Sequence, residues 1–200
     1  MKKSIREPSE KLPIRLLRLE VGAFKANCYL IWDEKGNCVI IDAGEDAEFI
    51  EEKVRELRLA PKIILATHGH FDHLTAASSL SLAYSIPLYM SKKDKFLFRN
   101  LKEFPPLISK NQKEGDEVKV GDIFLEVLEV PGHTPGSLAY KLRNTPYVFS
   151  GDVFFADGSW GRTDFGYSDK ETLQKSILRL RKLSPKTIFC PGHAEEFANL

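Results

Sequence analysis

Three of the five histidines in the chain, together with an aspartate, fall within seven residues that read Thr67-His68-Gly69-His70-Phe71-Asp72-His73. The other two histidines stand in the segments Pro131-Gly132-His133-Thr134 and Pro191-Gly192-His193. Neutral imidazole is the commonest biological ligand for zinc and similar ions. An ordinary core or surface role would have to hold for all five histidines at once, so the pattern indicates a metal centre.

The composition is typical of one globular domain, with 42% hydrophobic and 28% charged residues among 200. We expect residues 1–13 to form an N-terminal arm and residues 14–200 to form the domain. Lys and Arg number 29 against 28 Asp and Glu, which leaves a formal charge of +1. A chain so nearly neutral shows no charge signature of a nucleic-acid or membrane-surface binder, and we expect a small-molecule substrate.

The three cysteines, Cys28, Cys38 and Cys190, form no Cys-x-x-Cys pair and are odd in number. This usage argues against a disulfide framework and favours a reducing compartment. Because no apolar segment approaches the length of a signal or membrane-spanning sequence, we expect a cytoplasmic location. Cys190 lies three residues before His193, but its place in an apolar run predicts a core position rather than a metal ligand.

Apolar runs separated by glycines predict the elements of the first half of the chain. We expect strands over residues 14–19, 27–32, 38–42, 62–66 and 88–90. Helical spacing of Ile50, Val54 and Leu57 predicts a helix over residues 46–59, and a run of small residues predicts another over 74–84. Residues 92–112 give no clear pattern.

The second half repeats this plan of strands followed by a helix. We expect strands within residues 117–130 and over 138–142, 146–149 and 186–190. The segment Ser168-Asp169-Lys170-Glu171 has the spacing of a capping box, and Leu173, Ile177 and Leu180 continue it as one face of a helix. Two similar halves of this kind predict a layered sandwich.

Each candidate ligand follows a predicted strand, so rigid strand ends are expected to present the ligands from loops. Gly69 is expected to let the backbone turn between His68 and His70. With Asp152 as a ligand shared by both, the candidate residues can bind two metal ions, which can also share a solvent molecule. The predicted ligands of one ion are His68, His70 and His133, and those of the other are Asp72, His73 and His193. A set of nitrogen and oxygen donors suits zinc first, with iron or manganese as alternatives.

These residues resemble the metallo-β-lactamase superfamily, whose His-x-His-x-Asp-His motif is matched by residues 68–73. The match continues through Asp42-Ala43-Gly44, Gly132-His133-Thr134-Pro135-Gly136, Gly151-Asp152, Gly161-Arg162-Thr163-Asp164 and Pro191-Gly192-His193. The resemblance implies an α+β fold, a four-layer αββα sandwich, with a metal cleft along one edge of two packed sheets. Within the superfamily the chain looks most like single-domain relatives of glyoxalase II.

That resemblance implies a hydrolase that cleaves a thioester such as a hydroxyacylglutathione, with a hydroxide shared by the two ions as nucleophile. We expect Asp72 and Asp152 to be the catalytic residues that orient this nucleophile. A thiolate leaves readily near neutral pH because the free thiol has a pKa of about 8.5. We interpret Arg162 and Asp164 as an ion pair that braces a loop, with contact to an anionic substrate as the alternative for Arg162. Phe24 and Trp160 could line the mouth of the cleft, but aromatic residues in a fold of this size are more often core residues, and no role is assigned to them.

Two other functions remain open. Persulfide dioxygenases have similar motifs, including Gly-Arg-Thr-Asp-Phe at residues 161–165, and hold one iron with residues that match His68, His133 and Asp152. A function of a different class is a metal-binding interaction module without catalysis. A nuclease is disfavoured because the chain shows no basic surface signature.

Overall fold

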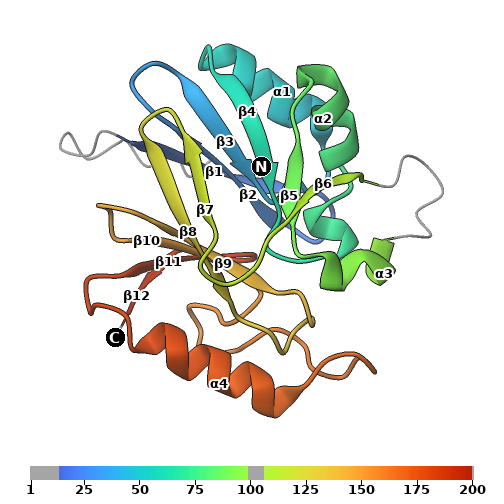
Figure 1. Ribbon diagram of the computed structural model, residues 1–200, viewed down its shortest axis with the longest axis vertical. Helices are drawn as coiled ribbons and strands as arrows, with labels where there is room; N and C mark the ends of the chain where they lie inside the picture. Colours follow the sequence, from blue (N-terminus) through green and yellow to red (C-terminus); the bar gives the residue numbers. More distant parts are fainter. Residues whose placement is uncertain (1–13, 99–105, 200) are drawn as a thin grey trace.

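The computed structural model describes residues 14–98 and 106–199. Two six-stranded sheets pack face to face, and helices cover the outer face of each sheet (Figure 1). The predicted arm over residues 1–13 lies outside the described residues. The four layers are those of the expected αββα sandwich, so the predicted fold class is confirmed.

The first sheet follows the chain in the order β1-β2-β3-β4-β5-β6. Its first three strands are antiparallel, and the pairs from β3 to β6 are parallel. Helix α1 (Ala47–Glu56) connects β3 to β4, and α2 (Ala77–Tyr84) connects β4 to β5, as parallel pairs require. The strands are β1 (Arg15–Val21), β2 (Ala26–Trp32), β3 (Asn37–Ile41), β4 (Ala60–Leu65), β5 (Leu88–Met90) and β6 (Ile108–Asn111).

The second sheet has the order β12-β11-β10-β9-β8-β7. Its pairs are antiparallel except β10 with β11, which are joined through helix α4 (Lys170–Arg181) on the outer face (Figure 1). The strands are β7 (Glu117–Val120), β8 (Ile123–Glu129), β9 (Leu138–Leu142), β10 (Tyr147–Gly151), β11 (Ile188–Pro191) and β12 (Phe197–Ala198).

The core divides into three apolar clusters, one between each pair of neighbouring layers. Strand β3 contributes to two of them, because Ile40 points toward α1 and α2 whereas Val39 and Ile41 point toward the second sheet. Alternate side chains of a strand face opposite sides, so a strand buried on both faces reads as a continuous apolar run. Burial of each such side chain contributes about 1.5–3 kcal/mol, which holds the strand ends that carry the site in place.

Four local details differ from the sequence-based expectations. The helix expected over residues 74–84 is preceded by a short 3-10 turn, η1 (Phe71–His73), and α2 itself begins at Ala77. Residues 92–112 contain a second 3-10 turn, η2 (Lys92–Asp94), the short helix α3 (Lys95–Phe98) and β6. Strand β12 was not predicted. The cap of α4 is the carboxylate of Asp169, which accepts from the Thr172 N–H, rather than the Ser168 hydroxyl.

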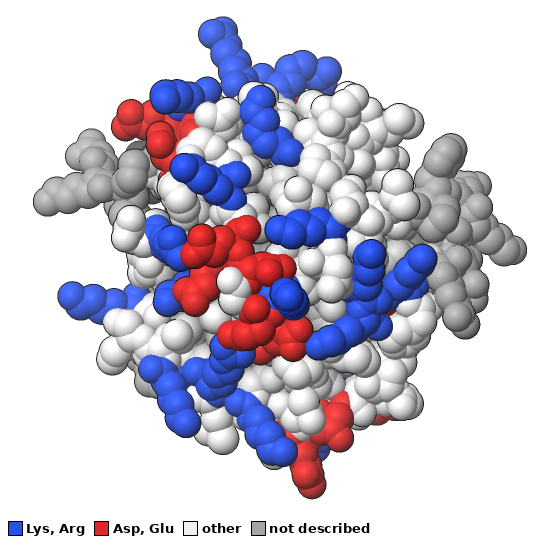
Figure 2. All heavy atoms as spheres, viewed as in Figure 1, with Lys and Arg blue, Asp and Glu red and all other residues white. Residues whose placement is uncertain are grey.

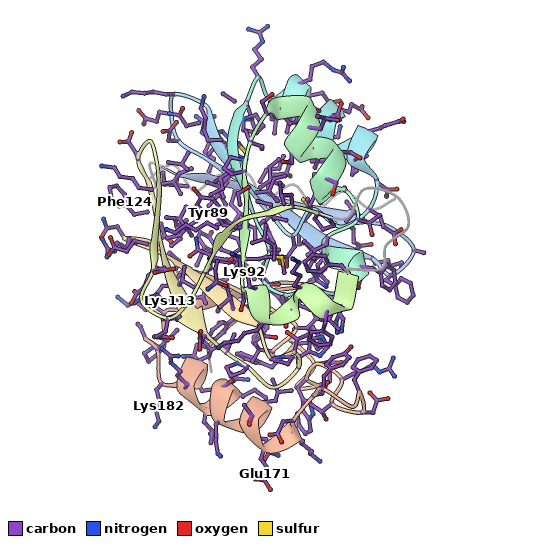
Figure 3. The ribbon with its side chains drawn as sticks, turned by 45° about the vertical axis from the view of Figure 1, so that its right-hand side comes forward. Tyr89, Lys92, Lys113, Phe124, Glu171 and Lys182 are labelled. Atoms are coloured by element: carbon purple, nitrogen blue, oxygen red, sulfur yellow. The ribbon has the colours of Figure 1, made fainter. Side chains whose placement is uncertain are left out.

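Figure 2 shows acidic side chains gathered near the middle of one face, with Lys and Arg side chains around them. Glu171 in the first turn of α4 and Lys182 at its end lie at opposite ends of the helix, as its dipole favours (Figure 3). Among the described residues, no helix is both long enough and apolar enough to cross a bilayer.

Candidate metal centre

The predicted ligands come from loops that follow four strands and meet at one edge of the two sheets. His68, His70, Asp72 and His73 follow β4, His133 follows β8, Asp152 follows β10 and His193 follows β11. Backbone hydrogen bonds join the sheets at this edge, where the Leu138 N–H donates to the Thr67 carbonyl at 2.7 Å and the Asn27 N–H donates to the Gly192 carbonyl at 2.7 Å. The loops are therefore held by both sheets.

Three histidines form the first group of ligand atoms. The Nδ1 atom of His70 lies 3.1 Å from Nε2 of His68 and 2.9 Å from Nε2 of His133. His68 and His133 are buried, and His70 is half-buried. A single ring hydrogen cannot serve both short contacts, whereas one cation can be shared by all three nitrogens.

The outer nitrogen of each of these rings has its own partner. Nδ1 of His133 donates to the Arg162 carbonyl at 2.9 Å. Nδ1 of His68 lies 3.1 Å from the Thr67 hydroxyl, which itself donates to Asp42 at 2.8 Å. Nε2 of His70 lies 2.8 Å from the Tyr167 hydroxyl. Because a hydrogen on the outer nitrogen leaves the inner one with a lone pair, these partners favour the tautomers that a metal ion requires.

Asp72, His73 and His193 form the second group. Oδ2 of Asp72 lies 3.3 Å from Nε2 of His193 and 3.7 Å from Nε2 of His73. Nδ1 of His73 lies 3.1 Å from Oδ2 of Asp42, and this arrangement directs Nε2 of His73 toward Asp72 and His193. Asp42 thus serves both groups, through Thr67 on one side and His73 on the other.

Asp152 lies between the two groups. Its Oδ1 is 3.6 Å from Nε2 of His73, and its Oδ2 is 3.6 Å from Nε2 of His133 and 3.6 Å from Nε2 of His193. Gly192 leaves room for this carboxylate, since a Cβ at position 192 would lie 2.1 Å from Oδ1. The structure therefore brings together all seven residues that the sequence singled out.

The site suits divalent cations on three observations. Within each of the groups His68–His70–His133, His68–His73–Asp152 and Asp72–His73–His193, the ligand atoms lie within 4.8 Å of one another. Tetrahedral ligands at zinc–nitrogen distances are separated by about 3.3 Å, close to the contacts seen here. Nε2 of His73 and Oδ1 of Asp152 are buried without a hydrogen-bond partner, which is costly unless a cation satisfies them.

The electrostatics differ between the two groups. Burial lowers the pKa of His68 well below its usual value and lowers that of His70 to about 4, so both rings are neutral near pH 7. Burial also opposes charge on His73, but the carboxylates of Asp152, Asp42 and Asp72 outweigh it and raise the His73 pKa to about 9. Burial would raise the pKa of Asp72, yet His193 and His73 lower it to about 2. The second group therefore favours positive charge strongly.

Sequence analysis missed Asp94, a buried residue of η2 that links two ligand loops. Its carboxylate accepts hydrogen bonds from the Gly69 N–H at 2.9 Å, the Gly136 N–H at 2.7 Å and the Thr134 hydroxyl at 2.7 Å. Gly69 was expected to supply conformational freedom, but it is absent from the glycines with positive φ. What position 69 requires is space, since a Cβ there would lie 2.6 Å from Cβ of Asp94.

Four other residues singled out from the sequence agree only in part with expectation. Arg162 and Asp164 form a two-pronged ion pair at 2.9 and 2.7 Å, as predicted, and it is exposed. Phe24 and Trp160 are not core residues, because they are 61% and 44% exposed. Phe24 instead packs edge-on against Phe71 of the histidine segment, with ring centroids 5.3 Å apart. Both lie on loops, where an aromatic residue is not committed to a core.

Cys190 is fully buried in the cluster between the sheets, as expected of a core residue. Cys28 and Cys38 are buried as well, and the three cysteines form no disulfide.

A cavity of about 500 Å³ lies apart from the candidate ligands and is lined by residues that include Lys62, Tyr89 and Lys110. None of the seven candidate ligands lines it. Convergent donor atoms, rather than cavity size, therefore mark the functional site.

The chain is similar to several known proteins in both sequence and structure. The chain is 40% identical over 189 residues to hydroxyacylglutathione hydrolase GloC of Haemophilus influenzae, covering 88% of each chain. Among solved structures, it is similar to TTHA1623 in a di-iron-bound form, with a TM-score of 0.81 and 33% identity over 92% of this chain and 94% of the other.

Two further structures are similar over 92% of this chain. The B3 metallo-beta-lactamase BLEG-1 has a TM-score of 0.84 and 29% identity, with 94% of its chain covered. ETHE1 from Myxococcus xanthus has a TM-score of 0.79 and 30% identity, with 80% of its chain covered. The family model described as Metallo-beta-lactamase superfamily matches residues 21–193. The chain therefore belongs to the metallo-β-lactamase superfamily, a family of metal-dependent hydrolases.

Proposed function

We propose that the protein is a dinuclear metal-dependent hydrolase that cleaves a thioester of the hydroxyacylglutathione type. In this proposal His68, His70 and His133 hold one divalent ion, zinc first and iron or manganese as alternatives. Asp72, His73 and His193 hold the other ion, and Asp152 reaches both. The observation that carries the proposal is the completeness of the second group, whose central residue His73 is already oriented by Asp42 at 3.1 Å.

A pair of bound divalent cations supplies Lewis acidity toward a carbonyl oxygen and lowers the pKa of water. The residues of the chain contribute orientation and charge. Because the pKa of Asp72 is about 2, its carboxylate is ionised near neutral pH and is able to accept a hydrogen bond from water. The half-buried carboxylate of Asp152, between the two groups, is placed to do the same from the other side.

The leaving group is the reason to prefer thioesters over amides. Every one of the five histidines, all within the described residues, turns a ring nitrogen toward the candidate ligand groups, so no histidine is left to act as a general acid. An amide nitrogen needs protonation to depart, whereas a thiol with a pKa of about 8.5 departs as a thiolate near neutral pH. The name of the Haemophilus influenzae relative, a hydroxyacylglutathione hydrolase, supports the same substrate class.

The proposal is tested by substituting one residue of the second group. His193→Ala is expected to lower the metal content from about two ions per chain to about one, with a loss of thioester hydrolysis of at least about 100-fold in kcat/KM. Glu195→Gln is the matched control, because Glu195 is an exposed residue of the same segment. Full hydrolysis by His193→Ala with a single ion would contradict the dinuclear mechanism.

A mononuclear iron persulfide dioxygenase is the second candidate, and the similarity to ETHE1 from Myxococcus xanthus is consistent with it. The two functions separate on their need for oxygen. Thioester cleavage under argon supports the hydrolase, whereas oxygen consumption with glutathione persulfide, retained in His193→Ala, supports the dioxygenase. A metal-loaded protein without either activity would support an interaction module.

A further inference from the structure

The loop over residues 162–168 is attached to His133 at both of its ends. Nδ1 of His133 donates to the Arg162 carbonyl at 2.9 Å, and the Ser168 hydroxyl donates to the His133 carbonyl at 2.8 Å. The Ser168 N–H also closes a turn onto the Phe165 carbonyl at 3.0 Å. These bonds hold the loop, and the side chains it carries, at a set distance from the first group of histidines.

Within this loop Tyr167 contacts a second histidine of the same group. Its hydroxyl lies 2.8 Å from Nε2 of His70, a contact between residues 97 positions apart in the chain. The Tyr167 ring is stacked on Phe165 at 5.2 Å and 8°, and Phe96 packs edge-on against it at 5.3 Å and 71°. Packing on two sides leaves the hydroxyl little freedom to move away from His70.

His70 is the histidine of the first group that most needs such a partner. It is half-buried, whereas His68 and His133 are buried. It also presents Nδ1 to the group, whereas the other two present Nε2. A rotation of its ring or a change of tautomer would remove the lone pair on Nδ1 from the site.

We infer that Tyr167 is a positioning residue, whose hydroxyl oxygen accepts the Nε2 hydrogen of His70 and so keeps Nδ1 directed at the position shared with His68 and His133. The inference rests on the proposed function, since it assigns Tyr167 a role toward the ion that this group would hold. It adds a residue outside the seven candidate ligands, supplied by a different loop of the fold.

The test compares Tyr167→Phe with the wild-type protein by metal content and by competition with a chelator, using zinc as the probe. Loss of the hydroxyl is expected to weaken one of two bound ions by about 10–100-fold and to leave the other unchanged. Substitution with cobalt provides a spectroscopic readout, because a change in the visible absorption of one ion reports a rearranged ligand.

Two control variants separate the hydrogen bond from packing. Phe165→Leu weakens the ring stack but retains the Tyr167 hydroxyl, and it is expected to reduce metal affinity less than Tyr167→Phe does. Tyr89→Phe removes a hydroxyl from β5 (Figure 3), where the ring lies beside Lys110 and lines the separate cavity, and it is expected to change nothing in metal binding. Thermal unfolding of metal-free Tyr167→Phe should differ from that of the wild type by no more than the loss of one hydrogen bond explains.

The outcomes distinguish this inference from the proposed function. If His70→Ala binds as many ions as the wild type, the dinuclear proposal itself fails. If the wild type binds two ions and Tyr167→Phe binds both with unchanged affinity, only the role of Tyr167 is overturned. Equal weakening of both ions would also overturn it, because that result indicates a general structural role.

Discussion

The backbone N–H of Gly69 donates a hydrogen bond to the buried carboxylate of Asp94 at 2.9 Å, and this contact sets the position of the loop between His68 and His70. The same carboxylate receives the Gly136 N–H of the His133 loop at 2.7 Å. A Cβ at position 69 would lie 2.6 Å from Cβ of Asp94, and one at 136 would lie 2.6 Å from its Cγ. Both glycines therefore allow one side chain to reach the backbone of two ligand loops.

Substitution of Gly69 by alanine is expected to destabilise the protein by about 1–3 kcal/mol, because the added methyl group has to displace Asp94. Urea unfolding of the metal-free protein measures this, and metal content shows whether the loop still binds. Gly166→Ala is the matched control, since nothing lies within 4 Å of a Cβ there, and it should change stability by less than about 0.5 kcal/mol. Equal effects of the two substitutions would contradict the close-approach argument.

Asp42→Asn is expected to weaken the second ion by about 10–100-fold, since the amide replaces the carboxylate that orients His73 and receives the Thr67 hydroxyl. Chelator competition measures the change. Asp33→Asn is a suitable control, because Asp33 is also buried and accepts backbone hydrogen bonds, from Lys35 and Asn37, but lies outside the site. It should lower stability without altering metal affinity; if it weakens metal binding equally, Asp42 has no specific role.

The ion pair between Glu114 and Arg179 predicts a pH-dependent contribution to stability. The hydrogen bond from Arg179 lowers the pKa of Glu114 below its ordinary value of 4.5. A lowered folded-state pKa means that the contribution is present above about pH 4.5 and is lost as the pH falls through the folded-state value. Because the side chains are 43% and 48% exposed, solvent screening limits it to about 1 kcal/mol.

Comparison of Glu114→Gln with the wild type by urea unfolding at a series of pH values measures this contribution. The variant should be less stable at pH 7, and the difference should shrink as the pH falls below about 4.5. A difference that stays constant over this range would show that the charge of Glu114 is not responsible.

Asp169→Ala is expected to destabilise α4, because the Asp169 carboxylate accepts the Thr172 N–H at 2.6 Å. Loss of a cap of this kind costs about 1 kcal/mol. Amide exchange at Thr172 provides the specific readout and should accelerate. Ser168→Ala is the informative comparison, since the Ser168 hydroxyl donates to the His133 carbonyl instead. Accelerated exchange at Glu171 in Ser168→Ala, with none in Asp169→Ala, would indicate that Ser168 is the cap instead.

Most of the fold was predictable because its strands are long apolar runs with glycines between them. The run expected at residues 38–42 is β3 (Asn37–Ile41), and the helix expected at 46–59 contains α1 (Ala47–Glu56). The 3-10 turns η1 and η2 and the last strand were not predictable. Strand β12 (Phe197–Ala198) has two residues and is defined by its pairing with β11, so no periodicity could reveal it.

The candidate ligands were predictable for a chemical reason, since a site of nitrogen and oxygen donors needs particular residue types, and the chain places all five histidines in short motifs after strands. The residues that orient these ligands carry no comparable signal. Asp94 is one aspartate in a stretch without clear pattern, and Tyr167 is one tyrosine in a loop.

The sequence by itself determined the apolar periodicity, the order of the elements and the identity of the donor atoms, because these depend on local spacing and on side-chain chemistry. Only the tertiary structure decided which other residues hold the candidate metal ligands in place. Asp94 meets Gly69 across 25 positions, and Tyr167 meets His70 across 97. Such contacts arise from the packing of two sheets at a shared edge, and the partner of each hydrogen bond is set by that packing rather than by neighbouring residues.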